Sequence, residues 1–433
     1  MAHLTDTLPA TADVVIIGAG LAGTAAAWAL TRFQPDLQVV LLEKNAMPGA
    51  GSSSASLECF RSCWYTPCIA RMMERSLEVF LNSDEIFGDG AASQLAVRQN
   101  GYLFCAFTEK QAQDIRDEVA HLHSIGLNHV EYLEADALYS RFSLPGDNVL
   151  AAKFDPMAGW LDSNALLQLY LKNSSVTLVT DVQQTRITTD AGRITGVTTS
   201  KGDIVAPKVL IAAGAGSYAI GRNAGVELPI VMRPRQSFTT GWRHDAISQQ
   251  SPMIIGSAPF PHFRPEARSG AIFGWEYEWT TKGLDDDNRL PDALREPASN
   301  SNSLKDPRFP SITLALLARQ FGHGDDEGFN DGRYLRNLHH NIGYYVYRDE
   351  AAAYTIDDDG NHVPYESQRA IIDKHPDIEG LYLSIAHVGH GIMTSPAAGE
   401  IAAQHILQQS LSDPIYADFG LDVTWVEHDE SVL

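Results

Sequence analysis

The sequence predicts an α/β fold with a doubly wound parallel sheet and a second, α+β domain that carries a mainly antiparallel sheet. Three observations predict this architecture. An apolar run at residues 14–17 opens directly into a glycine-rich turn, and buried-strand patterns that end in glycine-rich loops return at residues 209–217 and 380–391. Between these returns, residues 229–347 contain aromatic-rich segments typical of strands. A chain of 433 residues also exceeds what one hydrophobic core usually serves, so two domains are expected.

The first glycine-rich turn has the pattern G-x-G-x-x-G of a phosphate-binding turn. Its glycines permit a tight turn, a close backbone approach to a pyrophosphate and close packing of the next helix, in the order Gly18, Gly20 and Gly23. A helix is expected at 21–32. The following apolar run, 39–42, ends in Glu43, whose carboxylate can accept hydrogen bonds from an adenosine ribose. We therefore expect dinucleotide binding here, and a glycine turn that serves only packing is the alternative.

The remaining elements follow from periodicity and turn residues. Further helices are expected at about 66–80, 109–124, 133–139, 162–172 and 396–409. Strands are expected at 95–107, 176–179, 183–189 and 194–200, the last three as antiparallel segments. Asp162 or Ser163 provides a capping side chain for the helix that follows it.

Composition excludes several classes of protein. The 32 basic and 54 acidic residues give a formal net charge of −22, which repels nucleic acid and anionic membrane surfaces. No run of 18 apolar residues occurs and the N-terminal segment has no basic region, so we expect a cytoplasmic chain without a transmembrane segment or cleaved signal. The cysteines lack the spacing of a metal site, so reduced thiols and no metal are expected at Cys59, Cys63, Cys68 and Cys105.

The nucleotide domain is expected to be discontinuous. We assign it residues 1–90, 150–230 and 365–433, and assign the second domain residues 91–149 and 231–364. An insertion is expected near 283–332. An NAD dehydrogenase usually keeps its nucleotide domain nearly contiguous, so this division favours a flavin fold.

Four segments in this order resemble the D-amino-acid oxidase superfamily of FAD enzymes, in the branch of sarcosine oxidase, its β-subunit-like relatives and glycine oxidase. They are residues 14–43, the serine-rich loop 51–56 with Arg61, residues 210–217, and residues 380–399. Residues 343–345 also resemble the strand that crosses the flavin in the β-subunit-like branch. The resemblance implies an FAD domain with a Rossmann-like sheet and a substrate domain that roofs the flavin.

The resemblance also implies a set of cofactor contacts. They are Gly18, Gly20, Leu21, Ala22 and Gly23 at the pyrophosphate, Glu43 and Lys44 at the adenosine, Ser52, Ser53 and Ser54 near the phosphates and ribityl chain, Arg61, Val182 at adenine, Ala213, Gly214, and Gly389, His390, Gly391, Ile392 and Met393 beside the flavin. Noncovalent FAD is expected, because the serine-rich loop has no histidine and every cysteine precedes residue 106.

The loop 389–394 has an independent physical reason to lie beside the flavin. Reduced flavin carries negative charge near N1 and O2, and this loop offers backbone N–H groups at the start of a helix expected from about Pro396. Met393 stands where monomeric sarcosine oxidases have a lysine, which argues against a specific assignment of sarcosine as the substrate.

Substrates of the family mostly carry a carboxylate, which a guanidinium binds through two parallel hydrogen bonds. Arg61 and Arg348 are the candidates, and an ion pair is the alternative for each. Tyr345 can line the cavity, and His390 can bind substrate or hold the loop. A structural role is favoured for Arg233 and Arg235, and His262 and Trp242 are weaker candidates.

The expected activity is FAD-dependent oxidation of the C–N bond of a small, carboxylate-bearing amine, such as an N-alkyl amino acid or a D-amino acid, to an imine. Hydride passes to flavin N5, and oxygen or an electron-transfer partner reoxidises the flavin. A 2-hydroxy acid or glycerol-phosphate dehydrogenase of the same superfamily is one alternative. The other is a non-catalytic flavoprotein for assembly or interaction, with the insertion near 283–332 as either a docking surface or a lid.

Overall fold

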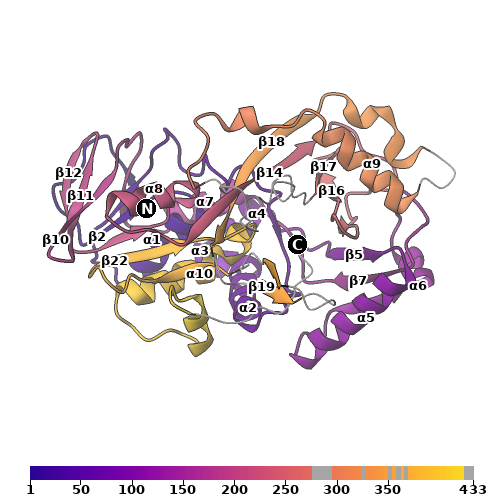
Figure 1. Cartoon of the computed structure of the whole chain (residues 1–433), viewed down its shortest axis with the longest axis horizontal. Coiled ribbons are helices and arrows are strands. Elements are labelled where there is room, and N and C mark those ends of the chain that lie inside the picture. The colour runs from indigo at the N-terminus through magenta and orange to yellow at the C-terminus, as the bar shows by residue number, and fades with distance from the viewer. Residues whose placement is uncertain (276–294, 323–326, 350–353, 357–361, 365–368, 424–433) are drawn as a thin grey trace.

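The computed structural model describes residues 1–275, 295–322, 327–349, 354–356, 362–364 and 369–423. Figure 1 shows two layered bodies side by side. One is built on a parallel sheet and the other on a large antiparallel sheet. The long strand β14 (Ile230–Thr239) contributes residues to the hydrophobic cores of both bodies. Its partner strand β18 (His339–Arg348) contributes to the core of the first body.

The first body contains a seven-stranded sheet whose strands come from three separated parts of the chain. Its order is β1 (His3–Leu4), β9 (Val176–Val179), β3 (Val39–Leu42), β2 (Val14–Ile17), β13 (Val209–Ile211), β22 (Leu381–Ile385) and β21 (Ile371–Lys374). Neighbouring strands are parallel except β22 with β21. The predicted α/β class with a Rossmann-like sheet is confirmed.

Other elements cover both faces of the seven-stranded sheet. Successive residues of a strand point to opposite faces, and both sets are apolar here, so each face is buried. Val14 and Ile16 face one hydrophobic cluster, whereas Val15 and Ile17 face another. The first cluster includes α1 (Leu21–Phe33), α2 (Pro67–Leu81), α7 (Ser163–Lys172) and α10 (Gly391–Ile406). The second includes α8 (Ser217–Asn223) and the three-stranded sheet of β10 (Arg186–Asp190), β11 (Arg193–Thr199) and β12 (Gly202–Val205).

The second body contains an eight-stranded sheet. Its order is β18, β14, β17 (Gly270–Gly274), β16 (His262–Glu266), β15 (Met253–Ile255), β5 (Tyr102–Ala106), β7 (Ala151–Asp155) and β6 (Glu131–Glu134). Its pairs are antiparallel except β15 with β5, so the expected mainly antiparallel sheet is present. Helices α5 (Glu109–Ser124), α6 (Ala135–Arg141) and α9 (Phe309–Phe321) accompany it.

Shorter elements connect these layers. They are the two-stranded pairs β4 (Cys59–Phe60) with β8 (Gly159–Trp160) and β19 (Tyr354–Ile356) with β20 (His362–Pro364), the helices α3 (Ser83–Phe87) and α4 (Ala91–Leu95), and 3₁₀ turns at Gly214–Gly216, Ser301–Leu304, Gly328–Asn330, Gly332–Leu335 and Pro414–Phe419.

Several local expectations were wrong. The strand expected at 95–107 is limited to β5, which begins at Tyr102, after α4 ends at Leu95. Residues 176–179 form the parallel strand β9 and pair with β3 and β1, because an apolar run can lie in a buried parallel sheet as well as in a hairpin. The helix expected at 133–139 begins at Ala135, after the strand β6. The cap of α7 was correct, since the Asp162 carboxylate accepts a hydrogen bond from the Ala165 N–H at 2.8 Å.

Helix α10 begins at Gly391, several residues before the expected start at Pro396. Proline removes the N–H that would bond the carbonyl four residues earlier, which is that of Ile392. The Ser395 hydroxyl donates to this carbonyl instead, at 2.9 Å. The helix therefore accommodates Pro396, and its first turn lies at residues 391–394.

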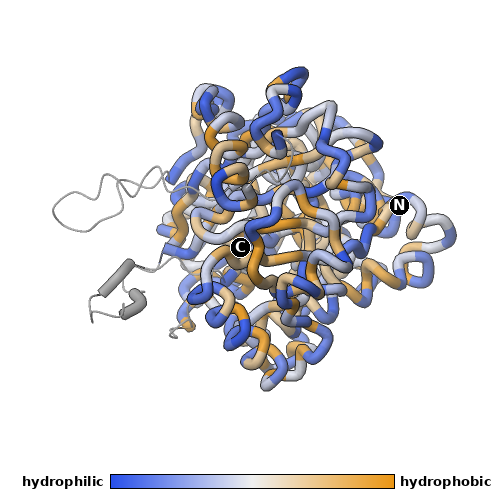
Figure 2. The backbone as a smooth tube through the Cα atoms, turned by 90° about the vertical axis from the view of Figure 1, so that its right-hand side faces the viewer, coloured by the Kyte–Doolittle hydropathy of each residue, from blue (hydrophilic) through white to orange (hydrophobic). Residues whose placement is uncertain are grey.

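Figure 2 shows hydrophobic segments gathered in the interior of the tube and hydrophilic segments in the outer loops. Within the described ranges, no helix has the length and apolar character needed to cross a membrane. Acidic stretches of the sequence at 285–287, 325–326, 357–359 and 427–430, and parts of the insertion expected near 283–332, lie outside the described residues. The domain boundaries stay predictions.

Candidate cofactor and substrate site

A cavity of about 830 Å³ opens where the carboxyl ends of the parallel strands meet the antiparallel sheet. Such a position is where doubly wound sheets bind ligands. Many residues expected from the sequence line it, namely Gly18, Gly20, Leu21, Ala22, Glu43, Lys44, Ser52, Ser53, Val182, Ala213, Gly214, Tyr345, Gly389, Gly391 and Ile392. The cavity thus joins segments from both ends and the middle of the chain.

The glycine turn between β2 and α1 is shaped by close backbone contacts. Gly18 has a φ of +108°, and a Cβ there would lie 2.5 Å from the Ala212 carbonyl oxygen. Gly23 does not line the cavity, and a Cβ there would lie 1.9 Å from the Gly18 carbonyl oxygen. At Gly20 the nearest described atom to a Cβ would be the Ser53 hydroxyl, at 3.3 Å. The turn therefore leaves space for a ligand at the start of α1.

Glu43 is 7% exposed and already shapes the far end of this turn. Its carboxylate accepts hydrogen bonds from the Ala19 N–H at 3.0 Å and from the Asn45 N–H at 2.9 Å. Its carbonyl accepts the Val182 N–H at 2.9 Å, and the expected adenine contact of Val182 stays a prediction. The Asn45 side-chain amide also donates to the Glu43 oxygen that accepts the Asn45 N–H, at 2.8 Å. The other carboxylate oxygen, which accepts only the Ala19 N–H among the described groups, has a second lone pair for a ribose hydroxyl.

The serine-rich loop divides its hydroxyls between the two bodies. The Ser53 hydroxyl accepts the Leu21 N–H at 3.2 Å, at the first residue of α1. The Ser52 hydroxyl donates to the Tyr344 carbonyl of β18 at 2.8 Å. Ser54 is exposed, lies outside the cavity lining and donates to the Gly51 carbonyl at 3.0 Å. The placement of Ser54 therefore gives no support to its expected cofactor contact.

The loop from β22 to α10 is strained. Ala386 and Val388 have φ values of +58° and +50°, and such strain in non-glycine residues gathers at ligand sites. Burial lowers the pKa of His387 to about 4, so its ring is neutral near pH 7. A Cβ at Gly389 would lie 2.6 Å from the Tyr345 ring, so glycine permits the close approach of the two bodies.

Two residues of this loop lie behind the cavity wall. Met393 is 6% exposed in the core beneath α10, so its side chain does not line the cavity. His390 is also absent from the cavity lining, and its ring meets Trp64 edge-on at 4.3 Å between centroids. Because α10 begins at Gly391, the N–H groups of its first turn, rather than these side chains, face a ligand from this loop.

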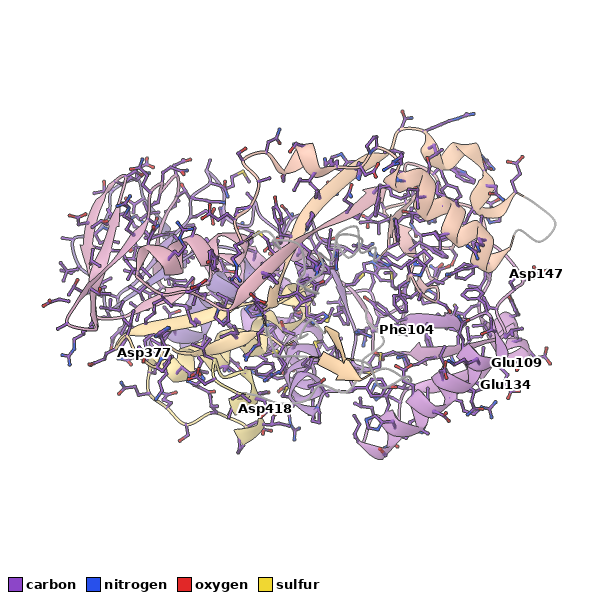
Figure 3. All side chains as sticks on the ribbon, in the orientation of Figure 1. Phe104, Glu109, Glu134, Asp147, Asp377 and Asp418 are labelled. Atoms are coloured by element: carbon purple, nitrogen blue, oxygen red, sulfur yellow. The ribbon has the colours of Figure 1, made fainter. Side chains whose placement is uncertain are left out.

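Arg61 lies outside the cavity lining, among aromatic side chains. It is 5% exposed, its guanidinium stacks on Trp64 at 3.8 Å from the ring centroid, and it lies 5.5 Å from the ring of Phe104. Figure 3 labels Phe104 near the junction of the two bodies. No hydrogen bond or ion pair to a described residue compensates the Arg61 guanidinium. A buried, uncompensated cation costs free energy and calls for an anion.

Arg348 is placed differently from the expectation. Its guanidinium lies outside the cavity lining and donates to the Gly420 carbonyl at 2.6 Å and to the Leu421 carbonyl at 3.3 Å. It therefore holds the segment that follows α10. This geometry gives no support to the expected role as a carboxylate ligand, which stays a prediction.

The roof of the cavity contains residues that sequence reasoning ranked too low or missed. Arg235 lines the cavity and donates to the Tyr347 hydroxyl at 2.8 Å. Ser237, Trp275 and His262 line it as well, and Ser237 and His262 both pair across the sheet with Gly274. The register of β14, β17 and β16 brings these residues together, and no local pattern in the sequence reveals a register.

Metal chemistry finds no support among the described residues, where no group of three potential His, Cys, Asp or Glu ligands gathers. The four cysteines are free thiols in the structure. Burial raises the pKa of the Cys63 thiol to about 12, which keeps it protonated and unreactive near neutral pH.

The model of the FAD dependent oxidoreductase family (DAO) matches residues 13–405. The chain belongs to this family. The match extends over both bodies and confirms the resemblance to the D-amino-acid oxidase superfamily.

This FAD-dependent oxidoreductase also has curated relatives. The β subunit of sarcosine oxidase from Rhizobium meliloti is 27% identical over 61% of this chain and 64% of the relative. The β subunit from Arthrobacter is 26% identical over 53% and 57%. The chain thus spans less than two thirds of either relative.

Solved structures share the fold of this FAD-dependent oxidoreductase. L-proline dehydrogenase from P. horikoshii superposes with a TM-score of 0.73 at 20% identity, covering 96% of this chain and 98% of that one. Glycine oxidase from Geobacillus kaustophilus also gives 0.73, at 16% identity and with coverage of 96% and 100%.

The residues present fit FAD. The glycine turn leaves room for a pyrophosphate at the N-terminus of α1, and the cavity continues from Glu43 to the N-terminus of α10. Both helix ends favour negative charge, of the pyrophosphate at one end and of reduced flavin at the other. No cysteine lines the cavity, and noncovalent attachment stays a prediction.

Proposed function

We propose that this FAD-dependent oxidoreductase oxidises the C–N bond of a small amine that bears a carboxylate, such as an N-alkyl amino acid or another amino acid, to an imine. The observation that carries the proposal is the buried guanidinium of Arg61, which has no anionic partner among the described residues. Bound FAD supplies the hydride acceptor.

Two side-chain contacts connect Arg61 with the start of α10. The Arg61 guanidinium stacks on Trp64, and the Trp64 ring makes an edge contact with His390, the residue before the first turn of α10. A carboxylate held by Arg61 would therefore lie near the flavin end of the cavity. The two parallel hydrogen bonds of a guanidinium fix the orientation of a carboxylate, and this fixes where the amino carbon lies.

Names of relatives support the same substrate class. The sarcosine oxidase β subunits are named for an N-methyl amino acid, and the solved neighbours are named for proline and glycine. All of these compounds carry a carboxylate beside an amine. The cavity lining also offers the polar side chains of Arg235 and His262 on the roof, which suit a small polar substrate.

The decisive experiment is anaerobic reduction of the FAD-loaded protein. We expect one or more of proline, N-methyl amino acids and free amino acids to bleach the flavin absorbance, whereas 2-hydroxy acids and glycerol phosphate leave it unchanged. Air is then admitted to measure reoxidation by oxygen. Bleaching by hydroxy acids alone, or by no compound of either class, would overturn the proposal.

The variant Arg61→Ala tests the carboxylate site. We expect it to lower kcat/KM at least tenfold, or about 1.4 kcal/mol, for the carboxylate-bearing amine. Arg348→Ala is the matched control, because it also removes a buried guanidinium, but one that donates to the backbone carbonyls of Gly420 and Leu421. Equal effects of the two variants on kcat/KM would show that Arg61 does not bind the substrate.

A further inference from the structure

The backbone that follows Arg61 is held by a buried carboxylate at the end of β7. Asp155 is fully buried, and one of its oxygens accepts the N–H groups of Ser62 at 2.7 Å and Cys63 at 3.0 Å. Its other oxygen accepts the Ser62 hydroxyl at 2.9 Å and the Met157 N–H at 3.0 Å. Asp155 therefore binds the two residues that directly follow Arg61.

The other side of Arg61 is fixed by Trp64. The indole N–H donates to the Arg61 carbonyl at 3.1 Å, and the Trp64 backbone N–H donates to the Ser62 carbonyl at 2.9 Å. These bonds close a tight turn that places the indole beneath the Arg61 guanidinium. Asp155 and Trp64 thus define the position of Arg61 without any ligand.

The grouping of Ser62, His129 and Asp155 has the residue types of a nucleophilic triad but not its geometry. His129 Nε2 lies 2.6 Å from the Ser62 hydroxyl, and Asp155 also binds that hydroxyl directly. In a triad the carboxylate binds the opposite ring nitrogen, so that the three groups act in series. Here both partners converge on one hydroxyl, which indicates anchoring.

The charged side chains near this turn bind one another or backbone groups, so the Arg61 guanidinium is available to a ligand. Lys153, two residues before Asp155 on β7, is buried and pairs with Glu118. The Asp155 carboxylate accepts hydrogen bonds from backbone N–H groups and a hydroxyl. His129 Nε2 lies 3.7 Å from Asp155 Oδ1. The described carboxylates of this cluster therefore bind other groups than the Arg61 guanidinium.

We propose that Asp155 is the positioning residue that preorganises Arg61 for the substrate carboxylate, an inference that rests on the proposed function. A side chain held in place before binding loses less conformational freedom when the ligand arrives. Asp155 lies outside the cavity lining and acts through the backbone of residues 61–63.

Asp155→Asn tests this role at nearly constant volume. Whichever way the amide is oriented, its NH₂ group faces a backbone N–H, that of Met157 or those of Ser62 and Cys63, so an anchor of the turn is lost. Acetate serves as the probe, titrated into the FAD-loaded protein and followed by flavin absorbance. We expect acetate to bind at least fivefold more weakly, with FAD affinity within twofold of wild type.

Three further variants separate positioning from general stability. Ser62→Ala keeps both backbone bonds and should bind acetate within twofold of wild type, and Asp155→Glu should recover part of the affinity that Asp155→Asn loses. Glu400→Gln is the matched control, because Glu400 is a buried carboxylate with arginine donors on the helical side of the first body. It should leave acetate binding unchanged.

The outcomes distinguish this inference from the proposed function. If Arg61→Ala weakens acetate binding and Asp155→Asn does not, the positioning role is refuted and the carboxylate site stands. If Arg61→Ala has no effect, or if wild type binds no acetate, both fail. A parallel loss of FAD and acetate affinity in Asp155→Asn would assign Asp155 a merely structural role and also refute the inference.

Discussion

Replacing Gly23 by alanine tests whether the glycine turn is set by backbone contact. The new Cβ would stand 1.9 Å from the Gly18 carbonyl oxygen, and real Cβ contacts essentially never fall below 3.0 Å. The start of α1 must therefore move by at least about 1.1 Å relative to the turn. Misplacement of about 1 Å can cost about 100-fold where geometry matters, which is about 2.8 kcal/mol.

The expected result is a dissociation constant for FAD about 100-fold above that of wild type. It is measured by titrating FAD into the apoprotein and following flavin fluorescence. Gly241→Ala is the control, because a Cβ there meets no atom within 4 Å and its φ is not positive. If Gly23→Ala bound FAD within threefold of the Gly241→Ala protein, the contact argument would be refuted.

Three other predictions follow from the same region. Arg348→Ala should speed proteolytic cleavage around residues 420–423, measured by mass spectrometry, while KM changes by less than twofold, because its guanidinium holds carbonyls of that segment. His387 has its pKa lowered from 6.5 to about 4, so folding stability should fall as the pH drops from 7 to 5, by up to about 2 kcal/mol. Urea unfolding of His387→Asn should lack that part of the loss, and an unchanged pH dependence would contradict the assignment. Gly389→Ala should weaken FAD binding, and Tyr345→Ala should restore part of it in the double variant, since the new Cβ meets the tyrosine ring. Additive effects in FAD titrations would show that the two positions do not interact.

The sequence was most informative where a structure depends on local geometry. The strand, glycine turn and helix at 14–33 could be predicted because steric demands on Gly18 and Gly23 appear as residue types at fixed spacing. The cap at Asp162 and the helix at 109–124 are equally local. Most of the residues that line the cavity on the nucleotide side could be predicted from such local patterns.

Residues that depend on pairing between distant strands were harder to predict. Arg235 enters the cavity because β14 pairs with β18 so that Arg235 lies opposite Gly343, and only the folded sheet defines that register. Arg348 appeared equivalent to Arg61 in the sequence, since both are arginines near expected flavin segments. The structure separates them through their partners, which are backbone carbonyls for Arg348 and aromatic rings for Arg61.

The strands of the seven-stranded sheet come from distant parts of the chain, and this affects how the protein folds during synthesis. Its strand β13 lies between β2 and β22, so the middle of the sheet combines residues 14–17, 209–211 and 381–385. During translation, β2 and β13 emerge while β22 and α10 are still unmade, and one edge of β13 remains without its strand. Contacts this distant in sequence slow folding and expose strand edges meanwhile. The flavin end of the cavity therefore closes only after β22 and α10 have been synthesised, and the cofactor can be retained in full only by a chain that contains both.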